Sequence, residues 1–264
     1  MTVNQFVVRR GVHVLFMLGL FWAFDVPSSG ALQAGQTFTI SVNHPRPLAS
    51  AIEVLENRHG WVITYEDPPL LHPSDIEDVT LAVRRDHDLK KPRVLAPRGG
   101  PFNFRYSIPA GRVAPDESAL LERLLEEYHR SGHPGVFRVR RTGAVFHVVP
   151  TESKNALGHF EPRVSLLDST ISISDRERSA LGMIEEITAV VSGPAARVGI
   201  GTVPFNLLNQ VSVRGGARNE SARSVLLRTL ETTNRKMSWA LLCDPGPAPI
   251  CALNLHFVND RTDR

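Results

Sequence analysis

The sequence lacks the short motifs that mark many classes of enzyme. It contains no Gly-x-Ser-x-Gly, no His-Glu-x-x-His and no phosphate-binding loop pattern. Apart from one stretch near its beginning, it also lacks an apolar run that could cross a membrane as a helix. We therefore nominate no catalytic, metal-binding or cofactor-binding residue. Whether the chain is an enzyme stays open, and a non-enzymatic role is favoured.

Cysteine is scarce, with two residues in 264. Cys243 and Cys251 flank the loop 244–249, whose prolines cannot continue a strand ladder because they lack the N–H donor. The flanking strands are expected at Lys236–Cys243 and Ile250–Val258, so the two cysteines should face each other across a hairpin. In an oxidising compartment we expect a disulfide, and closing so short a loop stabilises the fold by about 2.5 kcal/mol. A redox-active pair is the alternative, but the tight Cys-x-x-Cys spacing that lowers a thiol pKa is absent.

The first residues are typical of a secretory signal. Arg9 and Arg10 supply the charged start, Gly11–Phe24 is an apolar run too short to span a bilayer comfortably, and small residues suited to cleavage follow within 29–34. No cysteine follows the apolar run, which excludes lipid attachment there. We therefore expect residues 1–34 to be a signal peptide and the mature protein to be periplasmic or secreted from a bacterium. An uncleaved N-terminal anchor is the alternative.

The sequence also lacks a strong excess of charge of one sign. The whole chain carries a formal net charge of +3, from 30 basic and 27 acidic residues. Removing Arg9, Arg10 and Asp25 with the leader leaves 28 basic and 26 acidic residues. This balance gives no reason to expect nucleic acid or a membrane surface as a partner, except through an uncleaved leader.

What the sequence does contain is a repeated order of strands and helices. We predict a first module at 35–150, interrupted by a proline- and charge-rich excursion at 67–101, then a linker at 151–167. A second module follows at 168–258, with a polar tail at 259–264. Each module should run β-α-β-β-α-β-β, so the fold class is α+β, with two tandem modules whose helices pack on small mixed sheets. The strongest helix is expected at Asp116–Arg130, where leucines recur at helical spacing.

Local signals place the elements of the second module. Ser174 and Glu177 fit a capping box, which predicts a helix beginning there. Leu207–Val213 is expected to be a strand. Asn219 is expected to cap the final helix, because its side chain can accept from free N–H groups of the first turn.

The first module resembles the short N-terminal domain shared by secretins and TonB-dependent receptors. The resemblance rests on three stretches and on the second helix: Phe38-Thr39-Ile40, Pro47-Leu48-Ala49-Ser50-Ala51-Ile52-Glu53-Val54-Leu55, Gly60-Trp61-Val62-Ile63-Thr64-Tyr65 and Ala119-Leu120-Leu121-Glu122-Arg123-Leu124-Leu125. Ile52 stands where the family has leucine in its Pro-Leu-x-x-Ala-Leu helix. The resemblance implies a periplasmic docking module that contacts other proteins through sheet edges and helix faces, and it supplies no catalytic residue to carry over.

These observations lead to three hypotheses about function. The preferred one is a non-enzymatic docking protein of the bacterial envelope that binds another envelope protein. Its candidate interaction surface comprises His72, Asp75, Asp78, Arg98, Arg138 and Arg140. The second is a metal-assisted hydrolase that uses the acidic and histidine cluster at 72–88, because oxygen and imidazole groups can ligate a metal or transfer protons. The third is binding of a cell-wall glycan by Arg138 and Arg140 on the hairpin.

Overall fold

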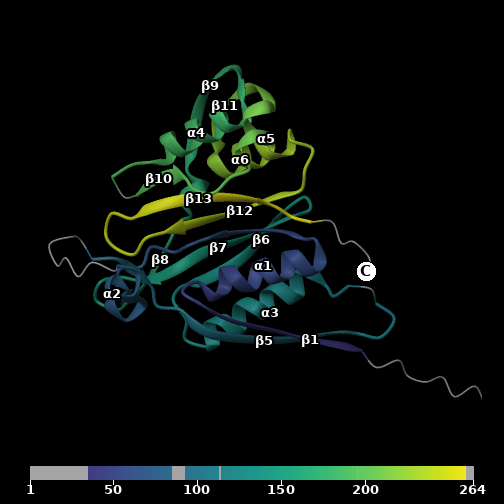
Figure 1. The fold of residues 1–264 in the computed structure, drawn as a ribbon, viewed down its shortest axis with the longest axis vertical. Coiled ribbons are helices and arrows are strands. Elements are labelled where there is room, and N and C mark those ends of the chain that lie inside the picture. The colour runs from purple at the N-terminus through teal and green to yellow at the C-terminus, as the bar shows by residue number, and fades with distance from the viewer. Residues whose placement is uncertain (1–34, 85–92, 113, 195, 260–264) are drawn as a thin grey trace, which may run out of the picture. The chain divides into compact units, whose positions relative to one another are not determined.

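A seven-stranded mixed sheet runs through the middle of the protein (Figure 1). Its strand order is β10-β13-β12-β2-β7-β6, with the short β8 paired to β7. The strands are β2 (Val62–Glu66), β6 (Val136–Thr142), β7 (Val145–Lys154), β8 (Phe160–Pro162), β10 (Arg197–Ile200), β12 (Met237–Cys243) and β13 (Ile250–Phe257). The computed structural model describes residues 35–84, 93–112, 114–194 and 196–259. The predicted signal peptide at 1–34 and most of the predicted tail therefore lie outside the described residues.

The N-terminal half packs two helices between this sheet and a two-stranded one. The elements are β1 (Gln36–His44), β5 (Gly100–Ile108), α1 (Pro47–His59) and α3 (Glu117–Arg130). β1 and β5 pair antiparallel along their whole length. In β5 every second residue is buried, from Phe102 to Ile108, because alternate side chains of a strand point to opposite faces. The leucine stripe of α3 meets these aromatic side chains in one core with α1.

The C-terminal half has the same arrangement of layers. Its elements are β9 (Thr170–Ser179), β11 (Ser212–Ser221), α4 (Ala180–Val191), α5 (Phe205–Gln210) and α6 (Ala222–Glu231). β9 and β11 form the outer two-stranded sheet, and the helices lie between it and β10, β13 and β12. Trp239 of β12 is fully buried in this second core.

The helices of the two halves cover opposite faces of the shared sheet (Figure 1). β2 shows why this works, because alternate side chains serve different cores. Ile63 and Tyr65 belong to the core with α1 and α3. Glu66 points to the other face and pairs with Arg223 of α6. The sheet is therefore sandwiched, with one half of the chain supplying helices above it and the other half below.

Several predicted elements are confirmed. The fold is α+β, with helices packed on mixed sheets. α3 begins after Asp116, whose side chain accepts from the Ala119 N–H at 3.0 Å. Gly60 ends α1 with φ 68°, a left-handed conformation that glycine adopts without penalty. The sharing of one sheet by both halves was not predicted, and the described residues form one compact unit.

Three predictions for the C-terminal half are wrong. Ser174 and Glu177 do not cap a helix, because both lie in β9, and α4 begins after Ser179. Residues 205–210 form helix α5 where a strand was predicted over 207–213. Asn219 lies in β11 with φ 53°, and Ser221 caps α6. In the first and third cases the long antiparallel pairing of β9 with β11 overrides the local capping signal.

The described part of the excursion is folded. The short turn η1 (Pro73–Asp75) leads into β3 (Ile76–Asp78), which pairs antiparallel with β4 (Leu95–Pro97), and α2 (Thr80–Val83) lies between them in sequence. The predicted linker also carries structure, because β7 extends to Lys154 and β8 pairs with its end. Among the described residues, no helix is both long enough and apolar enough to cross a membrane.

Candidate functional site

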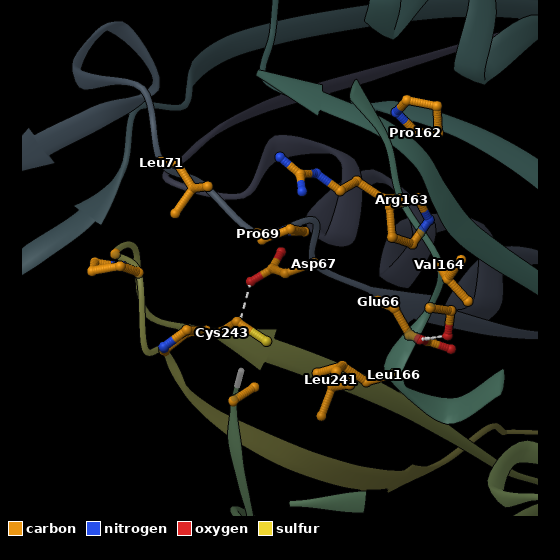
Figure 2. Close-up of a pocket in the computed structure, with 16 residues that line it drawn as sticks. Glu66, Asp67, Pro69, Leu71, Pro162, Arg163, Val164, Leu166, Leu241 and Cys243 are labelled. Carbon is orange, nitrogen blue, oxygen red and sulfur yellow. Dashed lines mark hydrogen bonds between the residues drawn. The ribbon is translucent and has the colours of Figure 1, made fainter. Parts of the chain in front are cut away.

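A cleft of about 350 Å³ opens where β2 and β12 end side by side (Figure 2). These two strands are parallel, so both chains leave the sheet at the same edge. The segment after β8 and the loop between β12 and β13 close the other sides. The lining residues are Glu66, Asp67, Pro69, Leu71, Pro150, Pro162, Arg163, Val164, Ser165, Leu166, Ala196, Leu241, Cys243, Gly246, Pro247 and Pro249.

Glu66 is a buried carboxylate whose partners all come from the C-terminal side of the chain. Its Oε1 forms an ion pair with Nη1 of Arg223 at 2.5 Å, although the angles do not meet the geometry of a hydrogen bond. Its Oε2 accepts a hydrogen bond from the Ser165 hydroxyl. Arg223 also donates to Ser165 at 2.8 Å and to Asp168 at 3.2 Å. Burial raises the pKa of Glu66, and Arg223 and Ser165 oppose that rise. These contacts fix α6 and the segment 165–168 on β2.

Asp67 is held as tightly on the opposite face of the sheet. Its Oδ2 accepts from Nε of Arg46 at 2.6 Å and from the backbone N–H of Cys243 at 2.9 Å. The Tyr65 hydroxyl donates to Oδ1 at 2.8 Å. Burial raises the pKa of Asp67, and the Arg46 guanidinium is the main opposing influence. Arg46 also donates to the Cys243 carbonyl at 2.9 Å, so this pair joins α1 to the end of β12.

The third charged group of the cleft is also engaged. Nε of Arg163 donates to the Ser153 hydroxyl at 2.8 Å, and Nη2 lies 3.2 Å from a carboxylate oxygen of Glu161. All three charges of the cleft therefore have partners inside the protein. The surface that remains for a ligand is mainly proline and aliphatic, and Val164 stands at its rim with 83% of its area exposed.

The predicted disulfide is confirmed and borders the cleft. Cys243 and Cys251 pair directly across β12 and β13 and are bonded to each other. The bond closes the proline loop whose Gly246, Pro247 and Pro249 line the cleft. It therefore limits the motion of one wall. Disulfides of this structural kind persist in oxidising compartments.

The six predicted interaction residues fall into two groups. His72, Asp75, Asp78 and Arg98 lie in the folded part of the excursion, and Arg138 and Arg140 lie in β6. Five of the six make internal contacts: His72 with Ser74, Asp75 with Lys154 at 2.7 Å, Asp78 with Thr80, Arg98 with the Ile76 carbonyl and Arg140 with Asp168 at 2.7 Å. Within the part of the chain that the structure describes, the exposed Arg138 has no ion-pair or hydrogen-bond partner.

The residues of the proposed hydrolase cluster do not gather around a metal position in the described chain. Among the described residues, no group of three or more histidine, cysteine, aspartate or glutamate side chains could hold a metal ion. Asp75 is buried and paired to Lys154, and Asp78 stabilises the start of α2. Hydrogen bonds from Thr80 lower the pKa of Asp78. Asp86, His87 and Asp88 lie outside the described residues.

Sequence reasoning missed the residues that build the cleft. Glu66 and Asp67 directly follow an apolar strand, which is an available signal, because a charge at the end of a buried strand must find a partner. Nothing local identifies Arg223 and Arg46 as those partners. A comparison with known proteins adds no assignment: no protein-family model matches this chain, and no curated protein and no solved structure shows significant similarity to it.

Proposed function

We propose that this protein is a non-enzymatic docking protein of the bacterial envelope that holds an extended segment of a partner protein in the cleft. The observation that carries the proposal is the contrast within the cleft between engaged charges and open apolar surface. Glu66, Asp67 and Arg163 all have internal partners, while Val164 is almost fully exposed at the rim. A concave, mainly apolar surface with its charged groups already paired is typical of a site that binds apolar groups.

The size and lining of the cleft favour a peptide segment over a free small molecule. A volume of about 350 Å³ is at the lower end for small-molecule sites, which span roughly 300–1,000 Å³. It can accept one or two side chains from a longer segment that continues along the surface. Burying one aliphatic side chain there contributes about 1.5–3 kcal/mol. The prolines keep the walls in place, so little ordering entropy is lost on binding.

The predicted leader and the disulfide together support an envelope compartment. A charged start and a short apolar run at residues 11–24 are typical of export. The Cys243–Cys251 bond fits the oxidising environment of the periplasm or the cell exterior. The partner is accordingly another envelope protein, and the interaction takes place after export.

The test is a matched pair of rim substitutions. Val164→Asp places a charge at the mouth of the cleft, and Leu157→Asp makes the same kind of change on the β7–β8 turn, where 79% of the side chain is exposed. Both sites are solvent-exposed, so neither variant should alter stability by more than about 0.5 kcal/mol. A photo-crosslinking amino acid at Val164 in the full chain, activated in living cells, captures and identifies the partner.

We expect a discrete crosslinked protein at Val164, loss of its binding in Val164→Asp, and unchanged binding in Leu157→Asp. The proposal fails if no crosslinked protein forms at Val164. It also fails if both aspartate variants bind the captured protein as the unmodified chain does.

A further inference from the structure

Within the described ranges, the seven-stranded sheet ends in two strands that pair with no further strand on their outer side. β6 is the last strand at one end and β10 the last at the other. An edge strand presents backbone N–H and C=O groups that can pair with another chain. In β10 the groups of Val198 already bond the Ser192 hydroxyl, at 2.8 and 3.1 Å, so Ile200 is the residue of this strand whose outward groups are left for pairing. The way in which the two halves of this chain already join shows which strand fits which edge.

The three sheet strands of each half pair in the same pattern. In the N-terminal half β2 pairs parallel with β7, which pairs antiparallel with β6. In the C-terminal half β10 pairs parallel with β13, which pairs antiparallel with β12. Corresponding rows across the sheet are Tyr65–Val148–Val139 in the first half and Ile200–Leu253–Leu241 in the second. Thus β10 corresponds to β2, and β12 corresponds to β6.

The internal junction joins the end of one half to the start of the other. β12 pairs parallel with β2, with Ala240 opposite Tyr65 and Leu241 opposite Glu66. Each strand of one half runs in the opposite direction to the strand that corresponds to it in the other half. The helices of the two halves lie on opposite faces of the sheet (Figure 1). The halves are therefore related by half a turn about an axis across the strands, combined with an advance of three strands. Such an operation does not close on itself.

We propose that β6 of one copy of this protein pairs in parallel with β10 of a second copy, so that the sheet continues from chain to chain. Repeating the internal junction at this edge puts Arg138 opposite Ile200 of the second copy and Val139 opposite its Gly201. Because each copy contains two halves, the step from one copy to the next is a full turn with an advance of six strands, so the product is an open chain of copies and not a closed dimer. Each copy adds about 29 Å, the width of six strands spaced about 4.8 Å apart.

A groove beside β6 is open where its counterpart is filled. Between α3 and β6 lies a groove of about 380 Å³, lined by residues of both elements. The corresponding place between α6 and β12 is occupied by β2, where Glu66 meets Arg223 and the Ser238 hydroxyl donates to the Ile63 carbonyl at 2.9 Å. The free β6 edge with its groove thus has the form of an unfilled half of the same junction.

Charge complementarity supports a second copy as the occupant. At the internal junction Ile52 of α1 lines a groove together with Ala240 of β12. Ile52 is the sixth residue of α1, and the sixth residue of α4 is Glu185. In β6, Arg138 takes the place that Ala240 has in β12. Both are exposed, and neither has a side-chain partner in the described chain. The apolar contact inside the chain becomes an Arg138–Glu185 ion pair between copies.

The same charges argue against pairing of β6 with β6 of another copy. β6 carries Arg138, Arg140 and Arg141 within four residues, so two such edges repel each other. The β10 edge carries Gly199 and Gly201, which leave room for these arginines, and it brings the acidic residues of α4 beside them. The proposal goes beyond the cleft, which lies elsewhere on the molecule, so Val164→Asp should not affect assembly.

Sedimentation velocity of the full chain over a wide concentration range tests the proposal. We expect species that grow continuously with concentration. Arg138→Glu and Glu185→Arg should each weaken association at least about tenfold, because each places like charges together. The double variant Arg138→Glu/Glu185→Arg should restore association to within about threefold. Arg214→Glu, an equal charge change at an exposed position of β11, is the matched control and should have no effect.

Three results would overturn the proposal. The first is a monomer at every concentration. The second is a dimer that does not grow further, which would indicate a closed pair. The third is a double variant that associates no better than the single ones. All substituted side chains are exposed, and melting curves of each variant show whether the fold is retained.

Discussion

Removal of Arg223 should destabilise the protein more than any other single charge deletion on α6. The guanidinium contacts the Glu66 carboxylate, Ser165 and Asp168, and only 7% of its side chain is exposed. In Arg223→Met the carboxylate of Glu66 stays buried without its counter-charge. Breaking a buried pair in this way costs about 3–5 kcal/mol, a large part of the roughly 5–15 kcal/mol by which a native domain is stable.

A matched pair on the same helix provides the control. Arg228 meets Glu220 at 2.5 Å, as Arg223 meets Glu66, but half of the Arg228 side chain is exposed. Solvent screens this pair, so Arg228→Met should cost about 0–1 kcal/mol. The double variant Glu66→Gln/Arg223→Met should recover most of the stability, because the amide keeps a partner in Ser165 and no charge is left buried.

The assay is urea unfolding of each variant, followed by tryptophan fluorescence, to which the buried Trp61 and Trp239 contribute, and by circular dichroism. For a protein of this size, 3–5 kcal/mol corresponds to a decrease of about 6–20 °C in melting temperature. The destabilisation by Arg223→Met should shrink on acidification. Burial raises the pKa of Glu66, so its carboxyl binds a proton more tightly in the native state than in the unfolded state. The stability gained from this protonation at low pH is lost as pH rises through the native pKa. Equal costs for Arg223→Met and Arg228→Met would refute the reasoning.

Three further outcomes follow from the same structure. Replacing Cys251 with serine should lower the free energy of unfolding by about 2.5 kcal/mol, measured against reduced and oxidised wild-type protein. The pKa of His256 is raised, chiefly by its hydrogen bond to Glu56. This pair therefore stabilises the protein below about pH 6.5, and its contribution is lost as pH rises through the native pKa. Glu56→Gln should lower the midpoint of the His256 titration measured by NMR. Burial lowers the pKa of His147 to about 4, so NMR should find its imidazole neutral at pH 5. The free energy of unfolding should decline as pH falls below about 6.5, because there His147 takes up a proton in the unfolded chain and not in the native one. An imidazolium signal for His147 in the native protein at pH 5 would contradict that assignment.

The parts of the fold that depend on neighbouring residues could be predicted from the sequence. The leucine spacing of α3, the glycine that ends α1 and the hairpin that brings Cys243 to Cys251 are all encoded within a few residues. The errors cluster where distant pairing decides the outcome. Ser174, Glu177 and Asn219 carry genuine capping chemistry, yet each lies in a strand because β9 and β11 pair on both sides of these positions, with two register shifts between.

The candidate site could not be predicted for a related physical reason. A buried carboxylate at the end of β2 requires a cationic partner, but the sequence does not identify which of the 30 basic residues is that partner. Arg223 is selected by the docking of α6 over the sheet, and Arg46 by the packing of α1 beside β2. The first is a consequence of the junction between the halves, and the second of packing within the N-terminal half. The tandem-module interpretation and the family resemblance remain predictions.

The junction between β12 and β2 also sets an order of events during synthesis. The chain emerges from its N-terminus, so β1, α1 and β2 are complete long before Met237–Cys243 exists. Until then β2 has no neighbour on one side, and the counter-charge for Glu66 has not yet been made. The nascent chain therefore passes through a stage in which one edge of β2 is unpaired and the Glu66 carboxylate is not yet buried. The disulfide joins the neighbouring strands β12 and β13, so it can form before β12 meets β2 and makes the hairpin a preformed partner for that edge.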